Sequence, residues 1–199
     1  MTDVFEKFIK QYNSIGSQKS DGYDKSFFDG MTDLEKEKAF EMLVQELIAP
    51  GVIEWLYYLD LAKTKKSLIN YISNLKKNEM DGVHRLYAFM FKQTGDKKYQ
   101  DLLIDNYPNY PDREKRQAIW LIHASKPERA KEIALYIGII KSSIRTKGLS
   151  TAADFFLRIN GFTLDTEEEK KEFYRLRKDL ESSDPALKEI AINNIIMRE

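Results

Sequence analysis

Apolar residues along this chain recur at intervals of three and four positions, and strict alternation with a period of two is rare. Spacing of this kind collects apolar side chains on one face of a helix. Residues 3–12 are an example, because Phe5, Phe8 and Tyr12 would share one apolar face. The pattern as a whole predicts at least ten short helices with short breaks between them, and it does not predict a strand.

Several helix starts are marked by residues whose side chains can accept hydrogen bonds from the free amides of the first turn. Thr32 with Glu35, and Thr166 with Glu169, have the spacing of a capping box, in which side chains and backbone amides pair reciprocally. A proline at the first helical position, as after Asp184, adds to the signal because its fixed φ suits that position. Further starts are expected at four capping residues: Asp112, Ser125, Ser150 and Asp184.

Two segments break the helical pattern. Residues 13–30 are rich in Ser, Gly, Asp and Lys, and we expect a loop there, with two phenylalanines near its end. A loop of this length is unusual in a compact domain and is often functional or disordered. The run Asn-Tyr-Pro-Asn-Tyr-Pro at residues 106–111 has two prolines close together, which exclude a regular helix. Tyr107 and Tyr110 are therefore expected in a second loop.

Short breaks between consecutive helices favour antiparallel neighbours. Many such hairpins in sequence favour a stacked solenoid over a closed four-helix bundle. We therefore expect an all-α fold, an α–α superhelix of stacked antiparallel helix pairs with roughly ten helices. A chain of 199 residues can bury one sizeable core, so we expect a single domain over residues 1–199 that is monomeric on its own.

Two segments resemble helices of HEAT-type repeats. The last segment, Asp184-Pro-Ala-Leu-Lys-Glu-Ile-Ala-Ile-Asn-Asn-Ile-Ile196, has a cap followed by the Leu, Ile-Ala, Ile spacing of such a helix. The predicted helix after Thr32, followed by Pro50-Gly-Val-Ile-Glu-Trp-Leu56, has the same order of helix, tight turn and second helix. The resemblance covers about a third of the chain and implies a superhelix of paired helices whose usual work is protein binding. By size and architecture the chain is also similar to bacterial immunity proteins, which neutralise toxins from competing cells.

Composition narrows the class of protein. The chain has no cysteine, which excludes disulfides, a cysteine nucleophile and a thiolate metal site, and which is typical of a reducing compartment. Its first residues carry acid where a secretion signal needs basic and apolar residues, and no apolar run approaches the ~20 residues of a membrane helix. The expected setting is cytoplasmic, without membrane contact. Basic and acidic residues number 32 each, so the basic excess of nucleic-acid binders is missing and nucleic acid is not the expected partner.

Motifs for catalysis are mostly missing. There is no glycine-rich phosphate loop, no Gly-x-Ser-x-Gly and no His-Glu-x-x-His, and neither a cofactor nor a metal is expected. His84 and His123 are far apart in the sequence, and we interpret both as ordinary helix residues. Paired carboxylates such as Asp101 and Asp105 share a helix face and are interpreted as solvated. A catalytic role for a carboxylate pair, or for His84 beside Asp81, stays open.

Charge is distributed unevenly although the total is zero. Residues 1–60 contain 12 acids and 6 bases, whereas residues 61–120 contain 12 bases and 7 acids. Complementary potentials steer partners together, so an acidic end would suit a basic partner, such as a nuclease that itself binds phosphate. Tyrosines in a loop are candidates for interface anchors. The predicted partner-binding residues are Asp33, Glu37, Glu41, Glu54, Tyr107 and Tyr110.

Three functions are open on the sequence alone. The first is a protein-binding module rather than an enzyme, most specifically an immunity protein that neutralises a basic, nuclease-type toxin by occluding it. The second is an enzyme or nucleic-acid-processing HEAT-like protein whose site lies in the basic middle region, in a groove holding His84, Asp81 and arginines. The third is a scaffold subunit, for which exposed aromatic residues should gather in one groove.

Overall fold

The structure, a computed structural model, describes residues 1–15, 22–76, 79–142 and 145–198. In these residues the regular elements are eleven α-helices and two short 3-10 helices, and no strand is present. The all-α class and the expected number of helices are therefore confirmed. The chain divides into two compact units, Met1–Gly82 (unit 1) and Val83–Glu199 (unit 2). The single domain expected over residues 1–199 stays a prediction.

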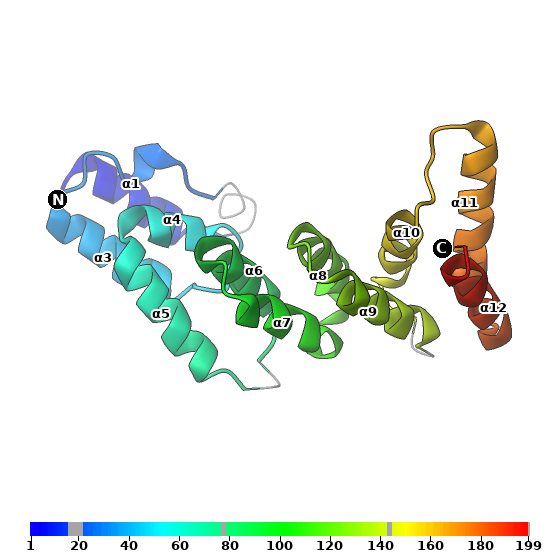
Figure 1. Ribbon diagram of the computed structural model, residues 1–199. Helices are drawn as coiled ribbons and strands as arrows, with labels where there is room; N and C mark the ends of the chain where they lie inside the picture. Colours follow the sequence, from blue (N-terminus) through cyan, green and yellow to red (C-terminus); the bar gives the residue numbers. More distant parts are fainter. Residues whose placement is uncertain (16–21, 77–78, 143–144, 199) are drawn as a thin grey trace. The chain divides into compact units, whose positions relative to one another are not determined.

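The helices of unit 1 follow one another in chain order in Figure 1. Helix α3 packs against α1 and α4, and α4 packs against α5. Asp60 alone separates α4 from α5, and its side chain caps the second helix by accepting from the Lys63 amide at 2.9 Å. The elements of unit 1 are α1 (Asp3–Tyr12), η1 (Lys25–Phe27), α3 (Asp33–Val44), α4 (Val52–Leu59) and α5 (Leu61–Ser73).

Phenylalanine rings connect the elements in the core of unit 1. Phe8 of α1 and Phe28 are fully buried, with their ring centroids 5.7 Å apart. Phe28 also stacks on Trp55 of α4 at 5.2 Å, so the residue that follows η1 joins α1 to α4. The loop expected over residues 13–30 therefore supplies core at its end, because its apolar side chains gain by burial. Residues 16–21 of that loop lie outside the described residues.

Unit 2 repeats one packing arrangement along the chain. Helices α6 and α7, α9 and α10, and α11 and α12 pack as consecutive pairs, and α8 contacts both α6 and α10. Pairing of consecutive helices is what the expected α–α superhelix requires, and Figure 1 lets the reader follow the pairs in chain order. The elements of unit 2 are α6 (Val83–Thr94), α7 (Lys97–Asp105), η2 (Tyr107–Asn109), α8 (Asp112–Ala124), α9 (Arg129–Lys141), α10 (Leu149–Ile159), α11 (Glu167–Leu180) and α12 (Pro185–Ile196).

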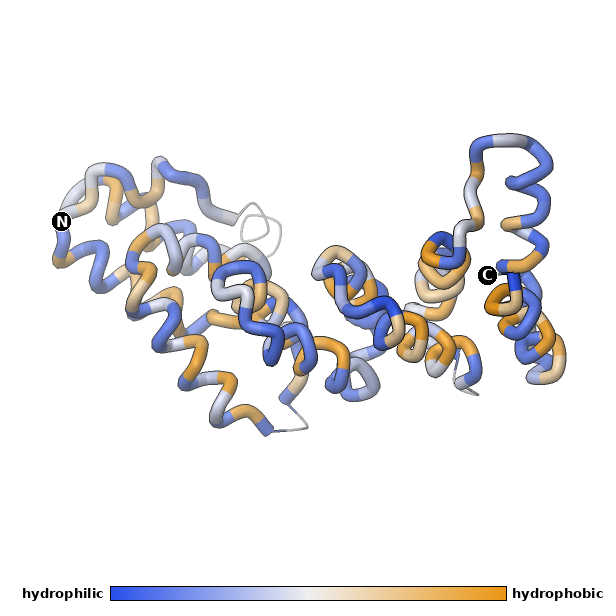
Figure 2. The backbone as a smooth tube through the Cα atoms, viewed as in Figure 1, coloured by the Kyte–Doolittle hydropathy of each residue, from blue (hydrophilic) through white to orange (hydrophobic). Residues whose placement is uncertain are grey.

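Most helices contain both hydrophobic and hydrophilic residues, as a helix with one buried and one exposed face requires (Figure 2). In unit 2 the buried faces meet in a core of fully buried side chains: Leu86, Leu103, Ile119, Ile140 and Phe156. Within the described ranges, no helix is both long enough and apolar enough to cross a membrane. The longest helix, α11, has 14 residues.

The clearest predicted helix starts are confirmed. The Thr32 and Thr166 hydroxyls accept from the amides of Glu35 and Glu169, and the carboxylates of these glutamates accept in turn from the amides of Thr32 and Thr166, which completes two capping boxes. Asp184 caps α12, with proline at the first helical position. These starts were predictable because the capping geometry is set by residues within one turn of each other.

Two predicted caps are wrong because the residues have other partners. Asp112 is the first residue of α8 rather than its cap, and its carboxylate accepts from the Lys147 amide at 3.0 Å. Ser125 ends α8, and its hydroxyl donates back into that helix. Helix α9 begins only at Arg129, because Lys126 adopts a left-handed conformation with φ of 50°.

The start predicted at Ser150 is also wrong. Helix α10 begins at Leu149, and Gly148 is its cap. A Cβ placed on Gly148 would lie 2.3 Å from the Tyr107 hydroxyl oxygen and 2.8 Å from Ile119 Cδ1. Glycine therefore occupies this position because the chain passes too close to these two side chains for a larger residue.

Candidate functional site

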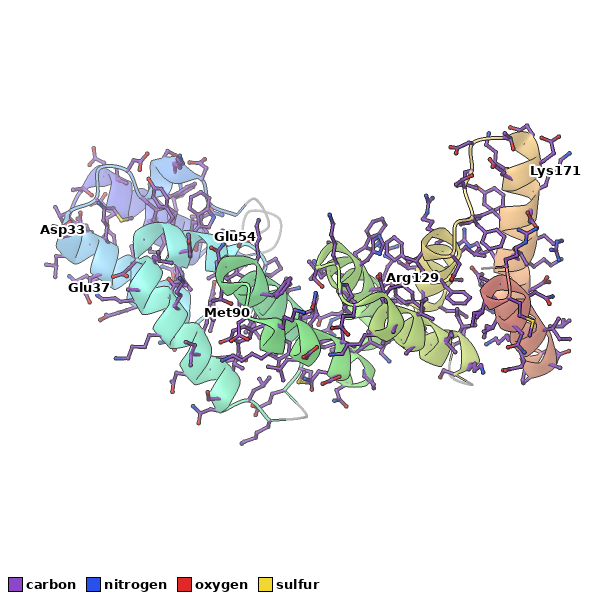
Figure 3. The ribbon with its side chains drawn as sticks, in the orientation of Figure 1. Asp33, Glu37, Glu54, Met90, Arg129 and Lys171 are labelled. Carbon is purple, nitrogen blue, oxygen red and sulfur yellow. The ribbon has the colours of Figure 1, made fainter. Side chains whose placement is uncertain are left out.

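The four acids predicted to bind a partner all lie in unit 1 and are exposed. Asp33, Glu37 and Glu41 follow one another at four-residue intervals on α3 and form one stripe, which we call the α3 stripe. Leu34, 66 % exposed, lies one turn before Glu37. Glu54 lies on α4, and Figure 3 shows it well apart from Asp33 and Glu37. The structure therefore brings three of the four acids together.

Lysine side chains neutralise part of the α3 stripe. The Lys63 ammonium of α5 donates to Glu37 Oε1 at 2.5 Å, and this hydrogen bond raises the pKa of Lys63. The pair lies in a small cleft of about 160 Å³ that Asp33 also lines. Unit 1 as a whole contains 14 acids and 11 bases, a net charge of −3. Its acidic excess is smaller than residues 1–60 alone suggested, because Lys63 and its neighbours belong to the same unit.

The two tyrosines predicted as anchors are buried. Tyr107 is 4 % exposed and Tyr110 is 2 % exposed, although both follow the Pro-rich pattern that predicted a loop. The Tyr110 hydroxyl donates to the Leu103 carbonyl at 3.1 Å, and its ring meets the His84 ring at 5.5 Å. Burial raises the pKa of both phenols, that of Tyr107 to about 12. Neither side chain can reach a partner in this conformation, so the anchor role is withdrawn.

His84 is enclosed rather than presented in a groove. It is fully buried, with Nδ1 3.2 Å from Glu114 Oε2 and Nε2 3.0 Å from Gln117 Oε1. Asp81, its expected neighbour, is exposed and precedes α6. The buried imidazole of α6 lies against Glu114 and Gln117 of α8, so it is not presented at the surface as a groove around His84 and Asp81 would require.

The other candidate chemistry lies on the surface. Asp101 pairs with Lys131 of α9 at 2.7 Å, so this carboxylate joins two helices across solvent-exposed side chains. In the part of the chain that the structure describes, no cluster of three or more His, Asp or Glu side chains could hold a metal ion.

An exposed tryptophan on α8 is the feature that the sequence reasoning missed. Trp120 is 55 % exposed, whereas Ala118, Ile119 and Ile122 of the same helix are fully buried. The signal was present, because a residue two positions from both Ala118 and Ile122 points about 200° away from them on a helix.

A hydrogen-bonded network holds the surroundings of Trp120 in place. Glu132 of α9 is 6 % exposed and its Oε1 lies 2.7 Å from His123 Nδ1 and 2.6 Å from the Tyr136 hydroxyl. Burial and the bond to Glu132 raise the pKa of Tyr136. Since a carboxylate only accepts, Nδ1 of His123 carries the proton and the ring orientation is fixed. The rest of the imidazole reaches solvent, with 36 % of the side chain exposed.

Phe155 of α10 packs against the rings of both Trp120 and His123. The His123 ring stacks on it at 4.0 Å and 14°, and the Trp120 ring meets it edge-on at 4.7 Å and 85°. Phe155 itself is 4 % exposed. One turn before Trp120, Arg116 is exposed and makes no ion pair within the described residues. We call the exposed surface of Arg116, Trp120 and His123 the Trp120 patch.

Arginine at the start of α9 adds to the positive charge of unit 2. Arg129, labelled in Figure 3, donates to the Ile159 carbonyl at 3.3 Å and to Asn160 Oδ1 at 3.2 Å, which ties α9 to the end of α10. Unit 2 contains 21 bases and 18 acids, a net charge of +3. The Trp120 patch therefore lies on the more basic of the two units.

Comparison with protein-family models, with curated proteins and with solved structures gives no significant match. The resemblance to HEAT-type repeats and to immunity proteins therefore stays a prediction.

Proposed function

We propose that the chain is a protein-binding module whose partner is anchored by the Trp120 patch. The observation that carries the proposal is a 55 % exposed tryptophan seated on a buried phenylalanine. Tryptophan and arginine are the residue types most enriched at binding hot spots, and the patch presents one of each on consecutive turns of α8.

Preorganisation supports this role. Binding costs the entropy of immobilising side chains, and a ring already packed against its neighbours costs less to bind. Trp120 meets Phe155 at 4.7 Å, and His123, held by Glu132, covers another part of the same ring. The indole therefore presents a large apolar surface in a restricted orientation before a partner arrives.

The chemistry of the patch defines the partner. Arg116, one turn before Trp120 on α8, is exposed and makes no ion pair within the described residues, and Lys126 and Arg129 are exposed close by in sequence. We therefore expect a folded protein partner with an apolar pocket for the indole and carboxylates around that pocket.

Exposed aromatic residues also bear on the scaffold alternative. Within the described ranges the exposed aromatic side chains are Tyr58, Trp120 and Tyr174, and they come from three different helices, α4, α8 and α11. The scaffold alternative, which needs the exposed aromatic residues gathered in one groove, stays a prediction.

The experiment is an affinity capture from the native cell with three baits: the wild type, Trp120→Ala and Tyr174→Ala. Tyr174 is the matched control, because it is also 55 % exposed and lies on another helix of unit 2. We expect a protein that the wild type and the Tyr174 variant retain and that the Trp120 variant loses. Equal retention by all three baits, or no retained protein at all, would contradict the proposal.

A second candidate is the immunity function, in which the α3 stripe contacts a basic toxin. It is favoured by the exposed run of Asp33, Glu37 and Glu41 with Leu34 as an apolar contact on the same helix. Rim charges act mainly on the rate of association and on its salt dependence. This candidate is compatible with the first, because a binding protein can use more than one surface.

Charge reversal tests the α3 stripe. Glu41→Lys should weaken binding of a basic partner several-fold at low salt and flatten its salt dependence, because an attractive charge becomes repulsive. Glu79→Lys is the control, since Glu79 is an exposed acid of unit 1 outside the stripe. Affinities measured from low to high salt that are equal for both variants would remove the stripe from the interface.

A further inference from the structure

An open cleft lies at the turn between α11 and α12, and we call it the α11–α12 cleft. Its volume is about 560 Å³, and none of its lining residues is buried. The lining comes from the second half of α11, from the turn after it, from Leu187 of α12 and from Arg145, which precedes α10. None of these lining residues lies on α8, so the cleft is a separate feature from the Trp120 patch.

The acids that line the cleft are already paired with arginines. The Glu181 carboxylate accepts from Arg177 Nε at 2.8 Å, and the same guanidinium lies 3.1 Å from Asp154 Oδ1. The Asp179 carboxylate lies 3.5 Å from Arg175 Nη1. Each acid of the lining therefore already has a cationic partner.

Two cations of the cleft have no acidic partner. Arg145 and Lys178 are exposed, and neither makes an ion pair within the described residues. They come from different segments of the chain and line the same cavity. Because the cations of the cleft are not all neutralised from within unit 2, the cleft favours an anionic partner.

Exposed apolar side chains lie beside these cations. Tyr174 is one turn before Lys178 on α11, and its ring meets that of the buried Phe173 edge-on at 5.9 Å. Leu187 and Ile190 are three positions apart, so they share one face of α12. Apolar surface next to polar groups is typical of an interaction site. In the described part of unit 2 six large apolar side chains are exposed, and five of them lie on these two helices or directly after α12: Tyr174, Leu187, Ile190, Ile196 and Met197.

We infer that the α11–α12 cleft binds an acidic segment of another protein. Carboxylates of the segment pair with Arg145 and Lys178, and an apolar side chain of the segment covers Tyr174 and Leu187. Charge complementarity selects this occupant, because both unpaired charges of the cleft are positive. Removal of the exposed apolar side chains from water adds to the affinity.

Two other classes of ligand suit the cleft less well. Natural small-molecule sites enclose their ligands, whereas every residue of this lining is exposed or half-buried, so a small molecule would remain largely in water. A nucleic acid carries a phosphate at every nucleotide, and Asp179 and Glu181 would repel such a row of charges. A peptide segment can place its acids only where the unpaired cations are.

The test uses a short labelled peptide in which glutamate and leucine alternate, titrated with the full chain and followed by fluorescence anisotropy. Two control peptides replace glutamate by lysine or leucine by serine, and a third control is a thymidine oligonucleotide of equal length. The Glu-Leu peptide should bind saturably, with an affinity that falls as the salt concentration rises. Each control should bind at least about tenfold more weakly, because it lacks the acids or the apolar side chains that the cleft selects.

Charge reversal at one lysine locates the binding site. Lys178→Glu should weaken binding of the Glu-Leu peptide about tenfold, because an attractive charge in the cleft becomes repulsive. Lys171→Glu is the matched control, since Lys171, labelled in Figure 3, is also exposed on α11 and does not line the cleft. This control should bind the peptide as tightly as the wild type does. Both lysines are exposed, so neither reversal disturbs the core, and circular dichroism checks that both variants are folded.

Two alanine variants separate this inference from the proposed function. Tyr174→Ala should weaken binding of the Glu-Leu peptide several-fold and leave the partner of the Trp120 patch bound, whereas Trp120→Ala should do the reverse. The inference is overturned if the Glu-Leu peptide shows no saturable binding to the wild type, if the Lys178 and Lys171 variants bind it equally well, or if a control ligand binds as tightly. None of these outcomes changes the binding expected at Trp120.

Discussion

At the scale of single residues, Glu35 joins the starts of two helices. Its carboxylate accepts from the amide and hydroxyl of Thr32, which caps α3, at 3.0 and 3.1 Å. It also accepts from the amide and hydroxyl of Thr2, which caps α1, at 2.7 and 3.0 Å. These hydrogen bonds, the backbone amides foremost, lower the pKa of Glu35 from 4.5 to about 2. The capping box was evident in the sequence, but the bond to Thr2 was not, because it spans 33 positions.

Glu35 should make the stability of unit 1 depend on pH. Because its pKa is lowered in the folded chain, the carboxylate contributes stability above pH 4.5 and loses it as the pH falls towards 2. Glu35→Gln should therefore lower the urea midpoint at pH 7, and its difference from the wild type should shrink at pH 3. Glu37→Gln, an exposed carboxylate on the same helix, is the control. A difference that is the same at both pH values would contradict this account.

Substitution by alanine should change the free energy of unfolding in opposite directions at two glycines of unit 2. Gly148→Ala places a methyl group 2.3 Å from the Tyr107 hydroxyl and should destabilise by about 1–3 kcal/mol, the usual cost of overpacking. Gly138→Ala meets open space inside α9 and should stabilise by about 0.5–1 kcal/mol, because alanine favours the helix. Urea unfolding of both variants measures the difference. Equal effects would show that the close approach at Gly148 is not restrictive.

At the scale of helices, Lys188 links α12 to the end of α9 by a buried hydrogen bond. It is 9 % exposed, and its ammonium donates to the Ile140 carbonyl at 2.7 Å, where that helix leaves carbonyls free. A second link between the same helices, Lys141 to Glu189 at 2.7 Å, is exposed. The two contacts join the same elements but differ in solvent access.

The buried link should matter more than the exposed one. Lys188→Met should destabilise by about 1–3 kcal/mol, because a buried carbonyl loses a charged donor. Lys141→Met should cost no more than about 1 kcal/mol, as surface ion pairs contribute little. Thermal unfolding at fixed pH compares the two variants. A larger loss of stability for Lys141→Met than for Lys188→Met would contradict this prediction.

Helices were predictable from the sequence where the signal was local. Residues 3–12 were predicted as a helix with the bounds that α1 has, and the end of α8 near residue 124 was also predicted, because periodicity and breakers lie within each segment itself. The starts at Ser125 and Ser150 failed because they depend on a left-handed Lys126 and on the distant Tyr107. The anchors Tyr107 and Tyr110 failed for the same reason, since tertiary packing buried a segment whose prolines indicated an exposed loop.

At the scale of the whole molecule, each unit has a surface suited to a different contact. Unit 1 presents the acidic α3 stripe, which the sequence predicted from charge alone, and unit 2 presents the Trp120 patch and the α11–α12 cleft. The cleft follows no linear motif, because it gathers residues from separate segments of the chain, whereas the three residues of the patch all lie on α8. Exposure of Trp120 was readable from the helical spacing, but its support by Glu132 and Phe155 was not.

Trp120 is the proposed anchor of a protein partner, and the affinity of the captured partner for two variants tests this role most directly. Trp120→Ala should raise the Kd at least 30-fold, the effect of a hot-spot residue contributing about 2 kcal/mol or more. Tyr174→Ala, with the same 55 % exposure, should change the Kd by no more than about twofold, as for a residue outside the interface. Calorimetric titration of both variants gives the answer. Equal affinities for Trp120→Ala and the wild type, with both proteins folded, would contradict the proposed function.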